Sequence, residues 1–349
     1  MLDNPPQLKF CIITKANMSQ NSLLLLSVVP FLTQLTLSTG TILQATFLQT
    51  RLPVPDNCTR PYHFPWEDVI TLFGSCRTNG NQNKDILRFR ISTDTIEKVG
   101  ELLEETNRGS VQADTAGNIY YLGGVSNWVQ KYNAAQNVTE RVTTFPFNLR
   151  DSTSVNINST SNEVIVFGGY GIPSAVYSID LDTFSTQYKT TLPQNILEAT
   201  SVRVGDFAYI FDSGASRNNR QVMRVNLKNF TTEMVGPPTL PAFSLRPSSV
   251  YDSTGNKVYV IGGYTFAGNE GNPTAGIYEF DPVTFENRFI PVANFPVTGE
   301  MYWGISPAAV YVEGLDRIYF FGGSLVTSYS WYQNEIFYVS LAPLRGNLG

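Results

Sequence analysis

The sequence contains a single histidine, His63, and only three cysteines. A metal site built on histidines needs at least two of them, so we expect no such site, and no Ser-His-Asp triad away from His63. Charged residues make up 15% of the chain, against roughly 25% in an average soluble domain, and its lysines and arginines are not clustered. The sequence therefore shows no electrostatic footprint for nucleic acid, and we expect no cofactor.

Long hydrophobic runs are also scarce. The one long apolar run covers residues 22–37, and it is shorter than the roughly 20 residues that a membrane-spanning helix needs. Lysines precede this run and small residues follow it, a pattern typical of a secretory signal. We expect residues 1–40 to be a signal peptide, with Met18 as an alternative start, and no membrane span in the remaining chain. A buried N-terminal strand or helix is the other interpretation.

The cysteines and glycosylation motifs agree with secretion. Cys11 lies within the expected signal, which leaves Cys58 and Cys76, a pair that an oxidising compartment would join. Four Asn-X-Ser/Thr motifs that follow the expected signal predict N-linked glycans. Their asparagines are Asn57, Asn137, Asn158 and Asn229. We therefore expect a secreted, extracellular glycoprotein.

A short apolar run that ends in two glycines recurs along the chain. Full copies end at Gly123-Gly124, Gly168-Gly169, Gly262-Gly263 and Gly322-Gly323, and weaker copies end at Gly74 and Asp212. A run of small residues precedes most copies, and runs of alternating apolar and polar residues follow them, so each unit predicts four short strands. Because six such units follow one another, residues 41–349 predict an all-β fold, a single six-bladed β-propeller with four strands per blade.

The two ends of the array predict how the ring closes. The sixth unit lacks its fourth strand, whereas residues 45–53 resemble a fourth strand that has no unit of its own. We expect the N-terminal strand to complete the last blade, because closure removes two exposed sheet edges. A bridge between Cys58 and Cys76 would then tie this strand's neighbourhood to the first blade.

With these motifs laid out, the chain resembles the kelch-repeat β-propellers over roughly residues 45–345. Four units carry the double glycine, but the tryptophan that the family usually places in the fourth strand is absent from every unit. The resemblance is therefore to a divergent, secreted type. It implies a monomeric binding or adaptor module rather than an enzyme.

The long connections fall between the second and third strands and between one blade and the next. Both kinds lie at one end of the strands, here named the loop face, where binding residues commonly concentrate. Aromatic residues in these loops are candidate interface anchors, although they would equally well plug the central channel. They are Tyr264, Phe266, Tyr302, Trp303, Trp331 and Tyr332.

Arginines recur just ahead of the first strand, as is usual in kelch repeats. They are Arg60, Arg108, Arg150 and Arg246. Together they would form a positive well for an acidic glycan or peptide, or each would bond backbone carbonyls and join neighbouring blades. The sequence thus predicts a secreted module that binds an extracellular protein or an acidic ligand on its loop face.

The same residues bear on two enzymatic alternatives. Kelch-like copper-radical oxidases require two histidine ligands and a tyrosine-cysteine pair, which one histidine cannot supply. Arginines together with Glu270 or Glu300 and with Tyr302 resemble a sialidase site, but the aspartate-box turns of that family are absent. A sialidase-like, glycan-acting hydrolase remains the alternative function.

Overall fold

The computed structural model describes residues 41–346, apart from residues 58, 78–81, 107, 212–220, 240–243, 263, 266–274, 297–307 and 324–332. All described residues belong to one unit, Gly40–Gly349. Among them, no helix is both long and apolar enough to span a membrane.

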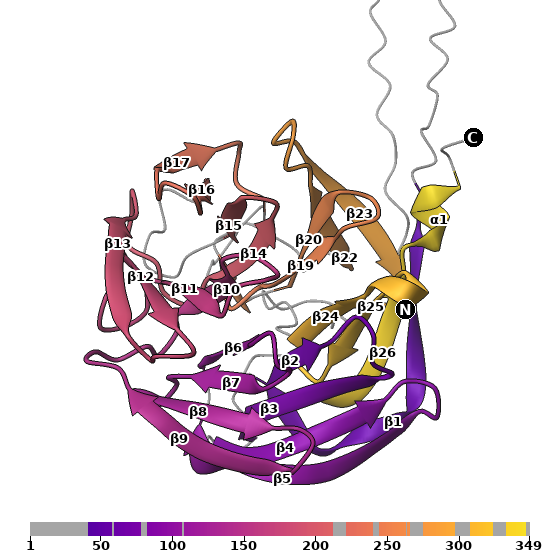
Figure 1. The fold of residues 1–349 in the computed structure, drawn as a ribbon. Helices are drawn as coiled ribbons and strands as arrows, with labels where there is room; N and C mark the ends of the chain where they lie inside the picture. Colours follow the sequence, from indigo (N-terminus) through magenta and orange to yellow (C-terminus); the bar gives the residue numbers. More distant parts are fainter. Residues whose placement is uncertain are drawn as a thin grey trace, which may run out of the picture. The chain divides into compact units, whose positions relative to one another are not determined.

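Most described strands form six antiparallel meanders of four strands each, named blades 1 to 6 (Figure 1). Blade 1 contains β2 (Arg60–His63), β3 (Val69–Arg77), β4 (Gln82–Arg90) and β5 (Thr95–Thr106). Blade 2 contains β6 (Ser110–Ala113), β7 (Ile119–Leu122), β8 (Trp128–Asn133) and β9 (Val138–Thr144). Blade 3 contains β10 (Thr153–Asn156), β11 (Glu163–Phe167), β12 (Ala175–Asp180) and β13 (Thr186–Thr191).

The second half of the chain repeats this pattern. Blade 4 contains β14 (Thr200–Val204), β15 (Phe207–Phe211), β16 (Val222–Asn226) and β17 (Thr232–Val235). Blade 5 contains β19 (Ser248–Asp252), β20 (Lys257–Ile261), β22 (Gly276–Phe280) and β23 (Asn287–Ala293). Blade 6 contains β24 (Ala308–Val312), β25 (Arg317–Phe321), β26 (Gln333–Ser340) and the N-terminal β1 (Leu43–Asn57).

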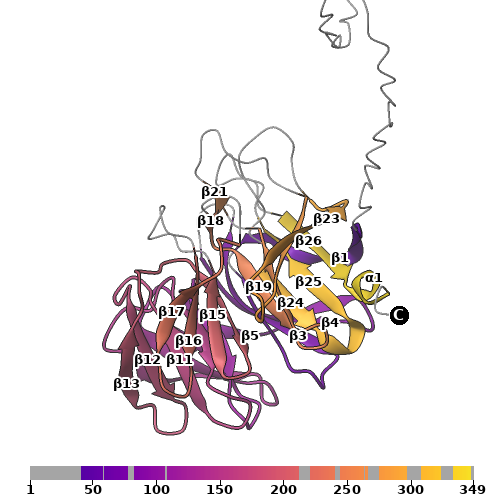
Figure 2. The ribbon, with the colours of Figure 1, turned by 90° about the horizontal axis from the view of Figure 1, so that it is seen from above.

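Three short elements lie outside the blades. Strands β18 (Ser244–Leu245) and β21 (Tyr264–Thr265) pair with each other, and Figure 2 shows this ribbon beyond the ends of the blade 5 strands. A 3-10 turn, Glu313–Leu315, separates β24 from β25, and helix α1 (Ala342–Arg345) follows β26.

The first strands of consecutive blades contact one another all the way round, from β2 through β6, β10, β14, β19 and β24 back to β2. They therefore surround the centre of the ring, with the fourth strands outside (Figure 1). This arrangement confirms the predicted all-β propeller. The predicted closure is also observed, since β1 pairs antiparallel with β26, for example at Ala45↔Val339.

One correction concerns the blades as separate sheets. Apart from the small β18–β21 ribbon, the hydrogen-bonded sheets number four rather than six, because β1 joins blades 5, 6 and 1 into a single 12-stranded sheet. Besides β26, it pairs in parallel with β23 at Leu43↔Val292 and antiparallel with β3 at Asn57↔Cys76. Strand β1 is thus longer than the predicted residues 45–53, and it bridges three blades.

The core consists of layers between neighbouring blades. In the second strands β7, β11, β15, β20 and β25, each of the last four residues is buried, which explains the apolar runs before the glycines. Between blades 5 and 6, Tyr259 and Ile277 pack with Phe320 and Phe337. The rings of Phe320 and Phe337 are stacked, with centroids 4.7 Å apart. Because both faces of a blade are covered, this burial is the main stabilising force of the ring.

The glycines after the second strand occupy positions that other residues would fill only with strain. Gly168 has φ +56°, and a Cβ added there would overlap the side chain of Ile196 and lie 2.8 Å from its carbonyl oxygen. Positive φ also occurs at Gly123, Gly124, Gly169, Gly262, Gly322 and Gly323, whereas Gly263 lies outside the described residues. In these positions the glycines allow left-handed backbone and close approach of the next blade.

Candidate binding site at the centre of the ring

A cavity of about 160 Å³ lies at the centre of the ring, on the loop face. All six blades contribute to it through their first strands and the residues just ahead of them. The lining comprises residues 59–61, 109–112, 151–154, 198–201, 246–249 and 308–309. We name this cavity the axial pocket.

Hydroxyl groups of the first strands line the axial pocket and connect adjacent blades. The Thr153 and Ser201 hydroxyls lie 2.7 Å apart, as do those of Thr200 and Ser249. Small side chains are needed here because six strands converge on one axis. Their hydroxyls satisfy one another across the blade boundaries, which leaves a polar wall rather than an apolar one.

Four charged residues form a ring around the pocket, named here the charged ring. Arg108, Asp151, Glu198 and Arg246 each lie two residues ahead of the first strand of blades 2 to 5, and their φ angles are +60°, +61°, +57° and +55°. Backbone N–H groups join them in sequence: Asp151 donates to the Arg108 carbonyl (2.9 Å), Glu198 to Asp151 (3.0 Å) and Arg246 to Glu198 (2.9 Å). Left-handed backbone also occurs at other repeated turns of this chain, so here it belongs to the repeat geometry that brings these four side chains to the same end of the ring.

Within the charged ring, each acid lies beside arginines. The Arg246 guanidinium donates to Glu198 Oε1 at 2.9 Å through Nε and 2.5 Å through Nη2. Arg108 Nη1 lies 3.5 Å from Asp151 Oδ2 and 3.6 Å from Glu198 Oε1, and Arg150 Nε lies 3.4 Å from Asp151 Oδ2. Burial and the nearby Glu198 charge raise the pKa of Asp151, and the three arginines only partly offset this.

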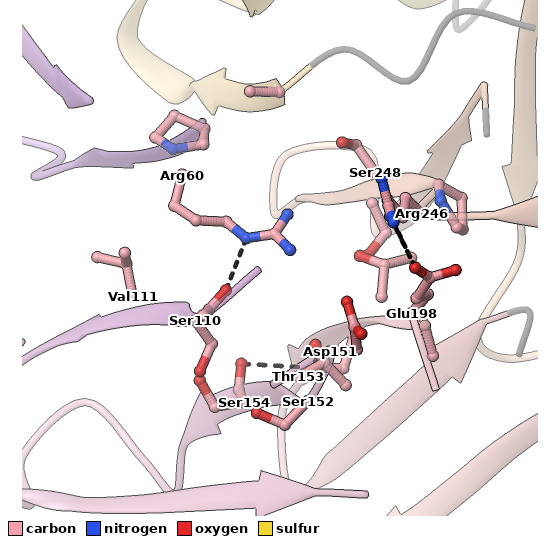
Figure 3. Close-up of a pocket in the computed structure, with 18 of the residues that line it drawn as sticks. Arg60, Ser110, Val111, Asp151, Ser152, Thr153, Ser154, Glu198, Arg246 and Ser248 are labelled. Carbon is pink, nitrogen blue, oxygen red and sulfur yellow. Dashed lines mark hydrogen bonds and ion pairs between the residues drawn. The ribbon is translucent and has the colours of Figure 1, made fainter. Parts of the chain in front are cut away.

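Arg60 differs from these arginines. It is the first residue of β2, at the place that Ser110, Thr153 and Thr200 occupy in the next three blades. Its Nε donates to the Gly109 carbonyl at 2.7 Å, and this is its one hydrogen bond to the described residues. The two terminal nitrogens point into the axial pocket (Figure 3). Burial lowers the pKa of Arg60, but a guanidinium stays charged at neutral pH.

Two serine hydroxyls in the same pocket also have unused hydrogen-bonding capacity. Ser110 and Ser152 are 8% and 4% exposed, and neither Oγ has a hydrogen-bond partner among the described residues. A buried polar group without a partner costs about 1–3 kcal/mol, so such groups call for an explanation. Among the described residues, the two terminal nitrogens of Arg60 and these two hydroxyls thus have no hydrogen-bond partner in the pocket.

The predicted arginines thus divide into two roles. Arg60 and Arg246 line the axial pocket, whereas Arg108 and Arg150 contact Asp151, which lines it. Sequence reasoning missed Asp151 and Glu198, although they lie at the same offset before the first strand as Arg108 and Arg246. It also missed the hydroxyls of Ser110 and Ser152.

Several other predicted residues cannot be placed. Tyr264 is described only in its backbone, and Phe266, Tyr302, Trp303, Trp331 and Tyr332 lie outside the described residues, as do Glu270 and Glu300. Cys58 also lies outside them, and the side chains of Asn57 and Cys76 are not described. The disulfide therefore stays a prediction.

The remaining predicted residues lie away from the pocket. Asn137, Asn158 and Asn229 are exposed in turns at the opposite end of the strands. His63 Nε2 lies 2.9 Å from the Glu67 carbonyl, in the first turn of blade 1. No group of three His, Cys, Asp or Glu residues in the described ranges is placed to hold a metal ion.

Comparison with known proteins agrees with this geometry. Residues 247–296 match the family described as Kelch motif, and this stretch contains the four strands of blade 5. Blade 5 thus carries a kelch motif, and the fold as a whole is a β-propeller. A solved structure titled "Structure of YjhT" resembles this propeller with a TM-score of 0.64 over 84% of this chain and 97% of that one. Their sequences are 12% identical, so this likeness concerns the fold alone. No curated protein sequence matches this chain.

Proposed function

We propose that this kelch propeller is a secreted, non-enzymatic binding module that takes an acidic side chain of an extracellular protein into its axial pocket. The kelch propeller scaffold is typical of protein-binding modules, which agrees with this class of function. The observation that carries the proposal is the Arg60 guanidinium, whose terminal nitrogens point into the pocket without a described partner.

The charge balance of the pocket favours one anion. Four arginines, Arg60, Arg108, Arg150 and Arg246, stand around two acids, Asp151 and Glu198. The acids are paired with Arg108, Arg150 and Arg246, whereas Arg60 makes no ion pair with a described residue. A guanidinium presents two parallel N–H groups that match a carboxylate, and burial strengthens such a contact relative to water.

The size of the pocket favours a single side chain over a whole small molecule. Cavities that enclose drug-sized ligands measure about 300–1,000 Å³. The volume of the axial pocket, about 160 Å³, is about half the lower limit of this range. It suits a carboxylate group and its short stem, with the free hydroxyls of Ser110 and Ser152 as further partners. The rest of such a partner would then rest on the surrounding loop face.

Secretion is part of the proposal and rests on the N-terminal apolar run and the sequons. Three of the four sequon asparagines are exposed in turns, where an attached glycan meets no steric obstacle. Mass spectrometry of the chain secreted from eukaryotic cells tests this part. A mature start near Thr41, occupied sequons and a Cys58–Cys76 bridge would support it, and retention inside the cell without glycans would contradict it.

The binding experiment uses unglycosylated protein and two blocked tripeptides, Gly-Glu-Gly and Gly-Gln-Gly, measured by NMR titration. We expect binding of the glutamate peptide only, and a loss of about tenfold or more in Arg60→Ala, since a hydrogen bond to a charged group contributes about 1.5–3 kcal/mol. Arg60→Lys keeps the charge without the fork and should bind weakly. The control is Arg90→Ala, which removes an exposed arginine at the end of β4.

Equal binding of both peptides, or unchanged binding in Arg60→Ala, would contradict the proposal. The same samples are assayed on sialosides, because a sialidase-like hydrolase is the alternative. Turnover that disappears in Arg246→Ala would favour the hydrolase over the binding module.

A further inference from the structure

A groove of about 470 Å³ lies between blades 1 and 2 at the opposite end of the strands from the axial pocket. We name this end the turn face, because the connections between first and second strands and between third and fourth strands lie there. Trp66 and Arg88 line the groove on the side of blade 1. Residues 115–117 and 134–135, from two turns of blade 2, line the other side.

Trp66 is unusually exposed for a tryptophan. It is 77% exposed, and its ring stacks on Phe64 with centroids 5.1 Å apart and planes inclined by 29°. Phe64 is 6% exposed and packs into the core between blades 1 and 2. The indole is therefore supported from beneath, while its outer face is an apolar surface that gains free energy when something covers it.

A predicted glycosylation site lies at the edge of this groove. Asn137 ends the turn between β8 and β9, the same turn that supplies residues 134–135 to the groove wall. Arg88 links the two, because its Nη2 lies 3.2 Å from the Ala134 carbonyl and 3.4 Å from Asn137 Oδ1.

The side-chain amide of Asn137 is oriented for a glycan. Its Oδ1 accepts a hydrogen bond of 2.8 Å from the Tyr132 hydroxyl, whereas its Nδ2 bonds none of the described residues. Nδ2 is the atom to which an N-linked sugar is attached. Tyr132 and Arg88 thus hold the oxygen, whereas the nitrogen of this exposed side chain bonds no described residue.

We propose that the first sugars of a glycan on Asn137 lie in this groove and cover Trp66. A pyranose ring has one face of C–H groups, which suits the indole, and an edge of hydroxyls, which suits Arg88 and Glu67 in the same groove. The groove volume falls within the range of about 300–1,000 Å³ of cavities that hold small ligands. The inference rests on the secretion proposed above and is independent of the axial pocket.

Another sequon provides a matched comparison on the same face. Asn229 is exposed in the turn between β16 and β17 of blade 4. Its Oδ1 accepts from the backbone N–H and the hydroxyl of Thr231, within its own sequon, rather than from any residue that lines the groove. A glycan at Asn229 should therefore be independent of Trp66.

The test is a double-mutant cycle on the full chain, secreted from cells that attach high-mannose glycans, with sequon occupancy confirmed by mass spectrometry. Asn137→Gln also removes the hydrogen bonds to Oδ1, so its effect on the unglycosylated chain is measured first and subtracted. We expect the remaining, glycan-dependent loss to be a few degrees of melting temperature, and to be small in the Trp66→Ala background. Asn229→Gln should have the same effect in both backgrounds. Trimming with an endoglycosidase that leaves one sugar should preserve the glycan-dependent part of the Asn137→Gln effect, whereas complete removal of the glycan should abolish that part.

An unoccupied Asn137, or an equal effect of Asn137→Gln in both backgrounds, would overturn the inference. A second result would also overturn it. If the fully glycosylated chain binds a free high-mannose glycan, and if Trp66→Ala abolishes this binding, the groove is open to other saccharides. The peptide titration of the axial pocket uses unglycosylated protein, so failure of the one proposal is distinguishable from failure of the other.

Discussion

The double-glycine positions provide a test of why the repeated motif needs glycine. Gly168 and Gly205 have nearly the same backbone, with φ +56° and +58°, but different surroundings. A Cβ at Gly168 would overlap Ile196 of the neighbouring connection and approach its carbonyl oxygen to 2.8 Å, whereas a Cβ at Gly205 would meet nothing within 4 Å. Alanine at both sites therefore carries the same conformational cost, and only at Gly168 does it add a clash.

We expect Gly205→Ala to lower the free energy of unfolding by about 1–2 kcal/mol, the cost of left-handed backbone for a residue with a Cβ. Gly168→Ala should cost about 2–5 kcal/mol, because forced overpacking adds roughly 1–3 kcal/mol. Urea denaturation followed by circular dichroism measures both values. If the two variants lose the same free energy of unfolding, the clash with Ile196 adds no cost at Gly168, and the reasoning is wrong.

Three further predictions concern other parts of the ring. Leu52→Ala, in the closing strand β1, should lower the free energy of unfolding by about 2–5 kcal/mol, whereas the exposed Leu103→Ala should change it by less than about 0.5 kcal/mol in the same urea experiment. Arg345 forms an ion pair of 2.5 Å with the fully buried Asp252 and one of 2.8 Å with Asp316. We expect Arg345→Ala to lower the free energy of unfolding by about 1–3 kcal/mol in thermal unfolding, and Arg345→Lys to restore part of this loss. The folded pKa of Asp151 is raised above its ordinary 3.8, so the folded state holds this proton more tightly than the unfolded state does. Wild-type stability should therefore fall as pH rises from about 3.8 to the folded pKa. In Asp151→Asn, urea midpoints measured across the same pH range should lack this fall.

The architecture was predictable from the sequence to a large extent because it depends on local patterns. Apolar runs that end in glycine identify the second strands, since burial on both faces demands continuous apolar residues. The unpaired strand at the N-terminus and the incomplete last unit predicted the closure. The joining of three blades by β1 was not predictable, because it depends on the parallel pairing with β23 and on a length that the apolar pattern does not mark.

The site was predictable only in part. The arginines were recognised because they recur at one offset, but Asp151 and Glu198 share that offset with the opposite charge and were not considered. The distinct position of Arg60 and the missing partners of Ser110 and Ser152 depend on six strands meeting at one axis. Which group remains unpaired there follows from distances across blades, and a sequence contains no such distances.

The closing strand β1 also has a consequence for how the protein is made. It leaves the ribosome before the other strands of the ring, yet its main partner β26 is near their C-terminal end, as the pairing of Ala45 with Val339 shows. Synthesis proceeds at about 5–20 residues per second, so β1 waits for tens of seconds with unpaired backbone edges. During that interval it is a template for mispairing with other nascent chains, so this protein should depend on chaperones that shield the N-terminal strand until the last blade has emerged.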